Sequence, residues 1–421
     1  MAVLLAGFIV STAGRSEADP LVEGERLAPP NIILIMADDL GTRAFAEVAT
    51  PGIDKMAADG LSFSFAHSTP LCTPTRVQIM TGKYGFRNYT KFGELRPGET
   101  TFAHLLKAAG YETCIVGKWQ LGGDAYAPYA FGFDDYCLWQ LGFSGYHERY
   151  HNPRLIRNTV EEKHHSGEYG PRLFTDHLKA FVQKHREGPF FVYYPMVLPH
   201  RPNVPVPGSA PYERVLGEER ASSDPRFFAE QVGYMDALVA EILTFLQTEG
   251  LAERTLVMFT TDNGTSGEIE VPTGSGRVMG QKGHTNLLAT HVPFVVWGPG
   301  FVAPGVSDRL LDFTDILPTL VEAAGSPLHP SFQTDGISFF ADLRGTPGMN
   351  RDWIFCHYDS GKPDFPLSRF VFDREWKLYA DGTVFNVAED PLETVPLESA
   401  ALSPTALVRI RQFESILQEL R

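Results

Sequence analysis

Cysteine, long apolar runs and positive charge are all scarce in this chain of 421 residues. The four cysteines show none of the C-x-x-C or C-x-x-H spacings of zinc sites. Beyond the N-terminal segment, no apolar run approaches the roughly 20 residues that a membrane-spanning helix needs, which argues against stable membrane insertion. Acidic residues outnumber basic ones by 51 to 36, and nucleic-acid phosphates require the opposite balance. With 43% hydrophobic residues the chain is too apolar to be disordered, so we expect a globular protein with a large core.

The first 18 residues have the composition of an export signal. An apolar run over residues 2–10 is followed by small residues, and Ser16-Glu17-Ala18 has the small-x-small pattern of a cleavage site. No Lys or Arg precedes the run, so a plain N-terminal tail or a misassigned start codon stays an alternative. We predict a signal peptide over residues 1–18 and a secreted or periplasmic protein.

Short apolar segments alternate with helix-like ones between residues 31 and 325. Five segments are apolar almost throughout, as is typical of strands covered on both faces: residues 31–36, 113–116, 189–194, 255–260 and 292–297. Helical patterns occupy residues 50–60, 100–110, 227–250 and 312–325. The alternation predicts an α/β fold with a large, mostly parallel central sheet and helices on both faces.

The pattern changes near residue 335, where shorter alternating pieces begin. They predict a small antiparallel sheet, and residues 405–420 predict a closing helix. We therefore divide the mature chain into an α/β domain over residues 28–334 and a C-terminal α+β subdomain over residues 335–421. Residues 123–170, rich in Tyr, His and Gly, are predicted to form long loops, which are often functional. Cys137 and Cys356 are a possible disulfide, although nothing in the sequence brings them together.

Polar residues follow four of the five predicted strands. Ligands of open α/β sheets bind beyond the carboxyl ends of the strands. The residues expected to converge there are Asp38, Asp39, Lys118, His200, Asp262 and Asn263. Taken singly, each is equally explained as a turn residue. Together, three carboxylates and an amide form an all-oxygen ligand set that suits a hard cation, with Ca²⁺ ahead of Mg²⁺.

Residues 71–82 predict a helix that begins near a cysteine. Pro74 suits the first turn, and Cys72 would lie at the helix N-terminus, where the dipole favours negative charge. A buried structural cysteine is one alternative, and an ordinary thiolate nucleophile is another.

The segment Cys72-Thr73-Pro74-Thr75-Arg76 resembles the Cys-x-Pro-x-Arg signature of the formylglycine-dependent sulfatases of the alkaline phosphatase superfamily. Gly117-Lys118-Trp119-Gln120-Leu121-Gly122 resembles that family's Gly-Lys-Trp-His-Leu-Gly motif with one change. Further similar segments follow in the family's order: residues 31–40, Pro199-His200, Thr261-Asp262-Asn263-Gly264, Gln281-Lys282-Gly283, His291-Val292-Pro293, residues 312–325 and Asp335-Gly336. The ordered set spans nearly the whole mature chain and is far more specific than any one motif.

The resemblance implies a sulfuric ester hydrolase and a role for each matching residue. A formylglycine-generating maturation enzyme would oxidise Cys72 to an aldehyde, whose hydrate attacks sulfur, releases the alcohol and leaves a covalent sulfo-enzyme. Arg76 would hold the hydrate, Lys118 and Lys282 would bind sulfate oxygens, and His200 would assist the leaving group. The implied calcium ligands are Asp38, Asp39, Asp262, Asn263 and modified Cys72. A dication and two ammonium groups suit the charge spread over the sulfate oxygens.

One departure from the family pattern concerns the second half of the reaction. Gln120 stands where the family has a histidine, and an amide cannot take a proton at neutral pH. A base must remove a proton to expel sulfate and regenerate the aldehyde, so another histidine would have to serve. His200 and His284 are the nearest candidates, because His284 follows Lys282 by two residues. The alternative is an inactive relative.

The favoured substrate is a sulfate ester of a carbohydrate, either a small molecule or a short oligosaccharide. Loops at residues 84–92 and 123–170 would set the specificity. The residues suggested for substrate binding are Lys118, Lys282, His284, Arg87 and His291. A net charge of −15 gives little steering toward a long polyanion. Two other functions stay open: a phosphate or phosphonate ester hydrolase with the same metal and nucleophile, and a non-catalytic sulfated-glycan binder with an unmodified Cys72.

Overall fold

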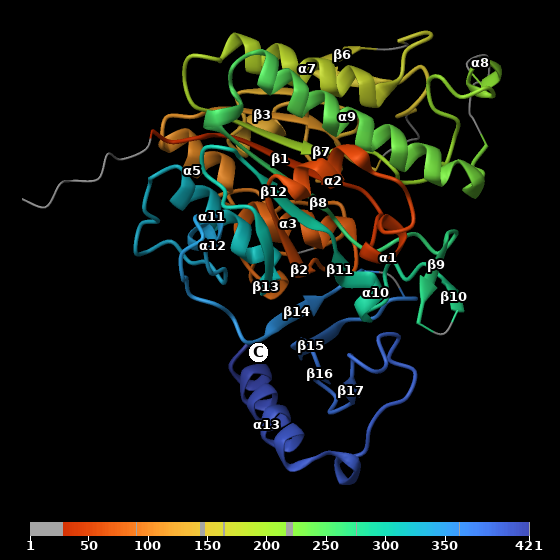
Figure 1. Cartoon of the computed structure of the whole chain (residues 1–421), viewed down its shortest axis with the longest axis vertical. Helices are drawn as coiled ribbons and strands as arrows, with labels where there is room; N and C mark the ends of the chain where they lie inside the picture. Colours follow the sequence, from red (N-terminus) through yellow and green to blue (C-terminus); the bar gives the residue numbers. More distant parts are fainter. Residues whose placement is uncertain are drawn as a thin grey trace, which may run out of the picture.

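The computed structural model describes residues 28–89, 91–143, 148–162, 165–215, 222–274, 276–361 and 363–420. The predicted signal peptide lies outside these residues. Figure 1 shows a large sheet between layers of helices, with a smaller sheet and one long helix beside it near the C-terminus. Within the described part of the chain, no helix combines the length and apolar character needed to span a membrane.

The larger part is built on an 11-stranded sheet, counted over the described residues. Its strands are β1 (Asn31–Ala37), β2 (Leu61–His67), β3 (Glu112–Gly117), β4 (Asp135–Leu138), β5 (Leu155–Arg157), β6 (Val160–Glu162), β7 (Phe190–Pro195), β8 (Thr255–Thr261), β11 (His291–Val292), β12 (Phe294–Trp297) and β13 (Gly305–Asp312). The order is β11-β2-β12-β8-β1-β7-β3-β4-β5-β6, with β13 paired to β2. The central run from β8 to β4 is parallel, and antiparallel pairs occur toward both edges. The predicted, mostly parallel α/β sheet is confirmed.

The sequence of β1 explains why the sheet is covered on both faces. All seven of its residues are buried. Ile33 and Ile35 belong to one hydrophobic cluster and Ile32, Leu34 and Met36 to another, because successive side chains of a strand point to opposite faces. A strand that is apolar at every position therefore requires a layer of helices on each side.

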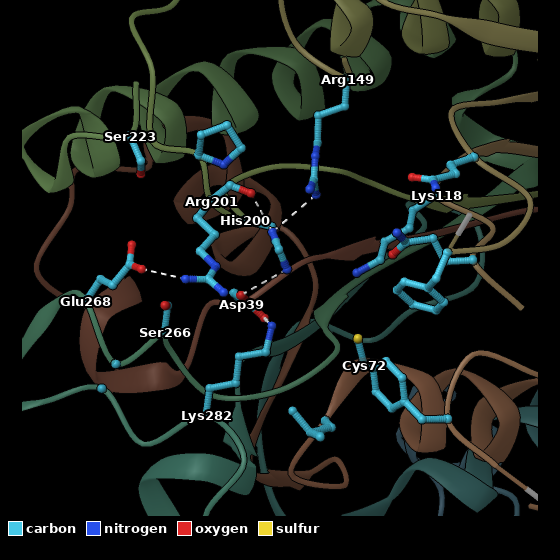
Figure 2. Close-up of a pocket in the computed structure, with 18 of the residues that line it drawn as sticks. Asp39, Cys72, Lys118, Arg149, His200, Arg201, Ser223, Ser266, Glu268 and Lys282 are labelled. Atoms are coloured by element: carbon cyan, nitrogen blue, oxygen red, sulfur yellow. Dashed lines mark hydrogen bonds and ion pairs between the residues drawn. The ribbon is translucent and has the colours of Figure 1, made fainter. Parts of the chain in front are cut away.

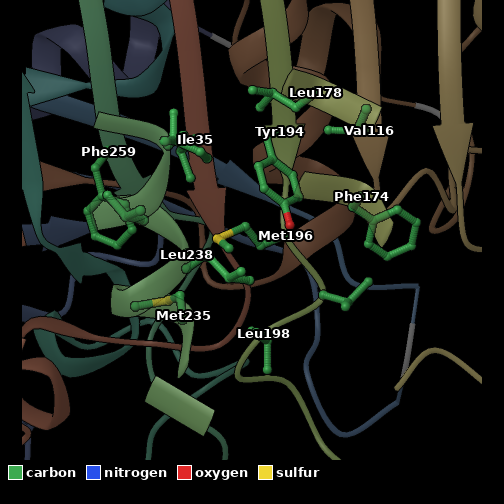
Figure 3. Close-up of a cluster of buried hydrophobic side chains, with 14 of the residues drawn as sticks. Ile35, Val116, Phe174, Leu178, Tyr194, Met196, Leu198, Met235, Leu238 and Phe259 are labelled. Atoms are coloured by element: carbon green, nitrogen blue, oxygen red, sulfur yellow. The ribbon is translucent and has the colours of Figure 1, made fainter. Parts of the chain in front are cut away.

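Two groups of helices supply these layers (Figure 1). One face is covered by α2 (Pro51–Ala58), α7 (Gly170–Lys184) and α9 (Phe228–Thr248), and the other by α3 (Cys72–Thr81), α5 (Phe102–Ala108) and α11 (Ile316–Ala323). Figure 3 shows the first layer, where Phe174 and Leu178 of α7 and Leu238 of α9 pack against the strands. The remaining helices are α1 (Thr42–Phe45), α4 (Gly85–Asn88), α6 (Ala127–Ala130), α8 (Tyr212–Val215), α10 (Leu287–Thr290), α12 (Phe340–Leu343) and α13 (Pro404–Glu419).

The predicted long loop over residues 123–170 was wrong in part. This stretch contains α6, β4, β5 and β6, and β4 pairs in parallel with β3 inside the central sheet. A strand of four residues, Asp-Tyr-Cys-Leu, is too short to give a period that separates it from a loop. The predicted strand over residues 292–297 also differs, because it divides into β11 and β12, and β12 runs antiparallel to β8.

The C-terminal part carries a second sheet of four antiparallel strands in sequence order. They are β14 (Ile354–Tyr358), β15 (Ser368–Phe372), β16 (Trp376–Tyr379) and β17 (Val384–Asn386). Helix α13 covers this sheet through a cluster that includes Phe355, Val371, Ile410 and Phe413. A separate antiparallel pair is formed by β9 (Glu270–Thr273) and β10 (Gly276–Met279). The division at residue 335 stays a prediction.

The suggested disulfide between Cys137 and Cys356 does not form. All four cysteines are free and buried, with Cys137 on β4 of the central sheet and Cys356 on β14 of the C-terminal sheet. Burial raises the pKa of the Cys137 thiol to about 12, so this cysteine is a core side chain and not a reactive thiolate.

The buried ion pair between Arg351 and Asp315 holds the segment that leads into the C-terminal sheet. Removing this ion pair tests the fold. Arg351 donates from Nε to Asp315 Oδ2 over 3.0 Å, and both side chains are buried. We expect Arg351→Met to lower the free energy of unfolding by about 3–5 kcal/mol, because Asp315 is left buried without its partner. Lys55→Met, which removes a partner from the exposed Lys55–Asp59 pair, is the control and should leave that free energy nearly unchanged. Urea unfolding followed by circular dichroism measures both, and a loss below about 1 kcal/mol for Arg351→Met would contradict the expectation.

Candidate active site

A cavity of about 1080 Å³ opens at the carboxyl ends of β1, β3, β7 and β8. Figure 2 shows Asp39, Cys72, Lys118, His200 and Lys282 gathered around it. They come from segments far apart in the sequence, and the parallel strands bring these segments together. The predicted convergence of polar residues at one rim of the sheet is thus what the described residues show.

The carboxylates at the cavity floor are held by the register of two neighbouring strands. Ala37 of β1 lies opposite Thr261 of β8, so the residues that follow them are adjacent. The Asp39 amide donates to Asp262 Oδ1 over 3.0 Å, and Asn263 Nδ2 donates to Asp39 Oδ1 over 2.8 Å. Asp38, Asp39, Asp262 and Asn263 are all at most 2% exposed.

Three buried carboxylates in one place raise an electrostatic problem. Burial would raise the pKa of Asp38, but Lys118, with Nζ 2.6 Å from Asp38 Oδ2, holds this pKa below its ordinary value. Burial likewise opposes ionisation of Asp39, and Lys282 and His200 outweigh it and lower the pKa. For Asp262, burial and the neighbouring Asp38 prevail and raise the pKa well above its usual range. The cluster therefore carries more negative charge than its own cations stabilise.

The same cluster offers oxygen atoms suited to a hard cation. Asp38 Oδ1 and Asn263 Oδ1 are buried, and neither has a hydrogen-bond partner in the described structure. Asn263 is oriented by its amide nitrogen, which donates to Asp39 Oδ1 and to the Gly264 carbonyl, both over 2.8 Å. Unpartnered buried oxygens are rare in folded proteins, and these two, together with Asp39 and Asp262, fit the oxygen ligands that calcium takes.

Cys72 begins helix α3 and points its sulfur into the cavity (Figure 2). Leu71 is extended just before it, and Pro74 lies in the first turn, as the sequence predicts. Arg76, one turn further, is buried and donates to the main-chain carbonyls of Lys118 and Trp119. Arg76 therefore ties α3 to the loop after β3 and fixes the position of Lys118.

Lys118 owes its position to the glycine before it. Gly117 has a φ of 104°, and a Cβ there would lie 2.3 Å from the Pro195 carbonyl oxygen, so no other residue fits without a shift. The Lys118 amide donates to that same carbonyl over 2.7 Å. On the opposite side of the floor, Lys282 forms an ion pair with Asp39, and this carboxylate raises the Lys282 pKa against the effect of burial. The Lys282 ammonium group is therefore charged at neutral pH.

His200 lies between the floor and the upper wall of the cavity. Its Nε2 is 3.5 Å from Asp39 Oδ2, and its Nδ1 is 2.7 Å from the Arg201 carbonyl oxygen. Burial lowers its pKa to about 3, and Asp39 and Asp38 oppose this while Lys282 and Arg149 reinforce it. The imidazole is neutral in the protein without a ligand.

The other residues suggested by sequence divide into two groups. Gln120 and His284 line the cavity. Arg87 does not, because it pairs with Asp335, with Nε 2.9 Å from Oδ1. His291 also lies elsewhere: its Nε2 is 2.9 Å from the Ser64 carbonyl oxygen and its ring stacks on His67.

The sequence analysis missed Arg149 and Trp139, which line the upper wall. Both belong to the stretch over residues 123–170 that was predicted to set specificity. Neither residue matches a motif, and only the location of the stretch pointed to them.

One cavity combines buried carboxylate and amide oxygens, Cys72 at a helix N-terminus, and the side chains of Lys118 and Lys282. This combination suits a hydrolase that acts on an anionic ester. The model of the family described as Sulfatase matches residues 30–326 of the chain. The chain belongs to the sulfatase family, whose members are sulfuric ester hydrolases.

Named relatives and a solved structure agree with this family. Arylsulfatase A of Homo sapiens is 31% identical over 386 residues, which cover 80% of this chain and 71% of that protein. N-acetylgalactosamine-6-sulfatase of Mus musculus is 29% identical over 402 residues, covering 85% and 75%. The structure of BT4656 in complex with its substrate D-glucosamine-2-N, 6-O-disulfate has the same fold, with a TM-score of 0.74 at 19% identity over 93% of this chain and 97% of that one.

Proposed function

We propose that the protein hydrolyses a sulfate ester of a carbohydrate, using formylglycine made from Cys72 and a bound calcium ion. The observation that carries the proposal is that Cys72 faces a cavity whose floor combines buried carboxylates with Lys118, Lys282 and His200. A cysteine with a purely structural role would not require these charged groups around it. The proposal includes a maturation enzyme that oxidises Cys72. It also includes an export signal, which would make the protein secreted or periplasmic.

The oxygen cluster supports calcium at the floor. Asp38, Asp39, Asp262 and Asn263 would hold the ion, together with an oxygen of modified residue 72. Two of these side chains, Asp38 and Asn263, each have a buried oxygen with no hydrogen-bond partner among the described residues. When present, formylglycine would supply a geminal diol as nucleophile, and calcium would supply a fixed double positive charge beside it.

The chain's own side chains supply binding and proton transfer. Lys118 and Lys282 bind the sulfate oxygens, because their side chains reach the floor from opposite sides, where Lys118 pairs with Asp38 and Lys282 with Asp39. The ion pairs with Asp38 and Asp39 hold the two lysines in place before substrate arrives, so little reorganisation is needed. His200 assists the leaving group through Nε2: because Nδ1 donates to the Arg201 carbonyl, Nε2 must first take up a proton before it can give one to the leaving oxygen. Arg76 keeps Lys118 in position.

Release of sulfate needs a base that Gln120 cannot provide. His284 is our candidate, because it lines the same cavity and stands two residues from Lys282. Its ring contacts Phe365 edge-on, with 5.4 Å between centroids, which limits the directions in which it can turn. His284 would accept the proton at a ring nitrogen, while Gln120 hydrogen-bonds the nucleophile.

The cavity supports a sugar ester as the substrate. Its volume of about 1080 Å³ accommodates more than one sugar ring, and four aromatic side chains line it: Phe92, Trp139, Phe143 and Phe365. Aromatic faces suit the apolar faces of sugar rings. One relative reported above is named N-acetylgalactosamine-6-sulfatase, and the BT4656 structure is described as a complex with a sulfated glucosamine.

The first test reads residue 72 and the reaction together. Mass spectrometry of protein from a host with maturation machinery should show an aldehyde or its hydrate at position 72, and that protein should release sulfate from a panel of sulfated sugars. Matched phosphate esters should react at least about 100-fold more slowly, because the second negative charge suits this site less well. Phosphate esters as the better substrates would establish the phosphohydrolase instead, and a fully retained thiol with tight binding of sulfated sugars would establish the binder.

The calcium site can be tested without turnover. We expect millimolar Ca²⁺ to raise the melting temperature of the metal-free protein by roughly 2–5 °C, and Mg²⁺ to raise it less, since an ion that binds only the folded state stabilises it. Asp262→Asn should abolish the shift, whereas Asp59→Asn, an exposed carboxylate away from the cavity, should keep it. An equal calcium shift in Asp262→Asn would rule out this site.

The base is tested by separating the two halves of the reaction. His284→Ala should keep the initial burst of alcohol and slow the later release of sulfate by about 100-fold, the lower end of the effect of a general base. His329→Ala, an exposed histidine far from the cavity lining, is the control. Sulfate release at the wild-type rate in His284→Ala would exclude His284.

A further inference from the structure

Arg149 differs from the other cations of the cavity because no carboxylate among the described residues pairs with it. Lys118 pairs with Asp38, Lys282 with Asp39, and Arg201 with Glu268, the last over 2.6 Å. These four are the lysines and arginines among the described residues that line the cavity. Arg149 is only 8% exposed, and its Nε has no hydrogen-bond partner in the described structure. A buried guanidinium without a counter-ion is costly and is rarely kept for stability alone.

The polar neighbour of Arg149 cannot satisfy it. Arg149 Nη1 lies 3.1 Å from His200 Nδ1, while the Arg201 carbonyl oxygen lies closer to that nitrogen, at 2.7 Å. The carbonyl can only accept, so the short contact requires a proton on Nδ1. Arg149 then faces an N–H group and not a lone pair. Its donors therefore need an acceptor from elsewhere.

Arg149 is also held rigidly. Its guanidinium carbon lies 4.0 Å from the centroid of the Trp139 ring, a cation–π contact that fixes the plane of the fork. Gly170 lets the chain pass so close that a Cβ there would be 2.0 Å from the Arg149 carbonyl oxygen. The next residue, Tyr150, places its hydroxyl 2.7 Å from the Val197 carbonyl oxygen. A cation fixed in this way meets a ligand without losing much side-chain entropy.

The position of Arg149 separates it from the groups assigned to the ester. Figure 2 shows His200 between Arg149 and Asp39, with Lys282 and Cys72 on the Asp39 side. A sulfate bound by Lys118 and Lys282 would therefore leave Arg149 free, on the far side of the histidine that faces the leaving group. An anion near Arg149 would belong to the part of the substrate that carries the ester.

We propose that Arg149 binds a second anionic group of the substrate, a carboxylate or a further sulfate on the sugar that carries the scissile ester or on its neighbour. This inference rests on the proposed function and narrows its substrate class to sugars with two anionic groups. The guanidinium fork binds either group through two parallel hydrogen bonds. The Trp139 ring beside it provides a face for the sugar.

The test uses matched pairs of ligands. One pair is D-glucosamine 6-sulfate and D-glucosamine-2-N,6-O-disulfate. The other is a monosulfated disaccharide with a uronic acid and its analogue in which the carboxylate is reduced to a hydroxymethyl group. With the mature enzyme, we expect the doubly anionic member of at least one pair to have the higher kcat/KM, and the pair that shows it tells sulfate from carboxylate.

Variants of Arg149 test whether this residue causes the preference for the doubly anionic ligand. Arg149→Gln should lower kcat/KM for the doubly anionic member by about 10- to 100-fold, mostly through KM, and leave the singly anionic member within about twofold. Arg149→Lys should keep part of the preference, because it keeps the charge but loses the fork. Arg226→Gln removes one exposed charge outside the cavity lining and should change neither member.

A structural role would give a different pattern. If Arg149 acted only by positioning His200, Arg149→Gln would lower kcat for both members equally, and this outcome would overturn the proposal. No preference in either pair would overturn it as well.

Binding to an unreactive protein separates this inference from the proposed function. With Cys72→Ala, calorimetric titration should show tighter binding of a doubly anionic ligand, and Cys72→Ala/Arg149→Gln should lose that gain. Such a result together with no turnover by the wild type would reject hydrolysis and keep the anion site. Turnover by the wild type with equal binding of both members of each pair would keep hydrolysis and reject the anion site.

Discussion

The crowding of three buried carboxylates at the ends of β1 and β8 is the constraint on which the site depends. Asp38, Asp39 and Asp262 are neighbours because two parallel strands are in register. Their mutual repulsion must be offset by positive charge, and Lys118 and Lys282 supply only part of it, as the raised pKa of Asp262 indicates. A site that is short of positive charge in this way favours a dication. The negative charge of the carboxylates also holds Lys118 and Lys282 at the floor, where both lysines are available to bind an anionic ester.

Main-chain packing carries this arrangement to the rest of the cavity. Lys118 reaches Asp38 only because Gly117 lets the chain pass against the Pro195 carbonyl, and Arg76 then fixes the following carbonyls. On the upper wall, the close approach of Gly170 to Arg149 has the same effect. The side chains that we propose to contact substrate are thus positioned by backbone contacts that leave them little freedom, and such rigidity favours both binding and catalysis.

The parts of the fold that could be predicted were those with a strong local signal. The strand of β1 is apolar at every position, and the polar residues after it stand where parallel strands end, so the acidic floor followed from the sequence. Strand β4 could not be predicted, because four residues carry no period. Arg87 looked suited to a substrate, yet its partner Asp335 lies 248 residues away, and only the folded chain reveals this ion pair. Arg149 shows the reverse case, since its lack of a carboxylate partner among the described residues can be recognised only in the folded chain.

The cavity therefore has two sides of different physical character. On the floor, opposite charges are paired and buried, and the residues come from the ends of the central strands. On the upper wall, Arg149, which has no carboxylate partner among the described residues, stands beside the Trp139 ring on the stretch between β4 and β5. This stretch reaches the floor in two ways among the described residues. Arg149 contacts His200, which lies beside Asp39, and the Trp139 amide and the Gln140 carbonyl hydrogen-bond Gly117 and Gln120 of the loop that carries Lys118. The groups proposed to bind the ester and the arginine proposed to bind a second anion are therefore connected both through His200 and through the loop that carries Lys118.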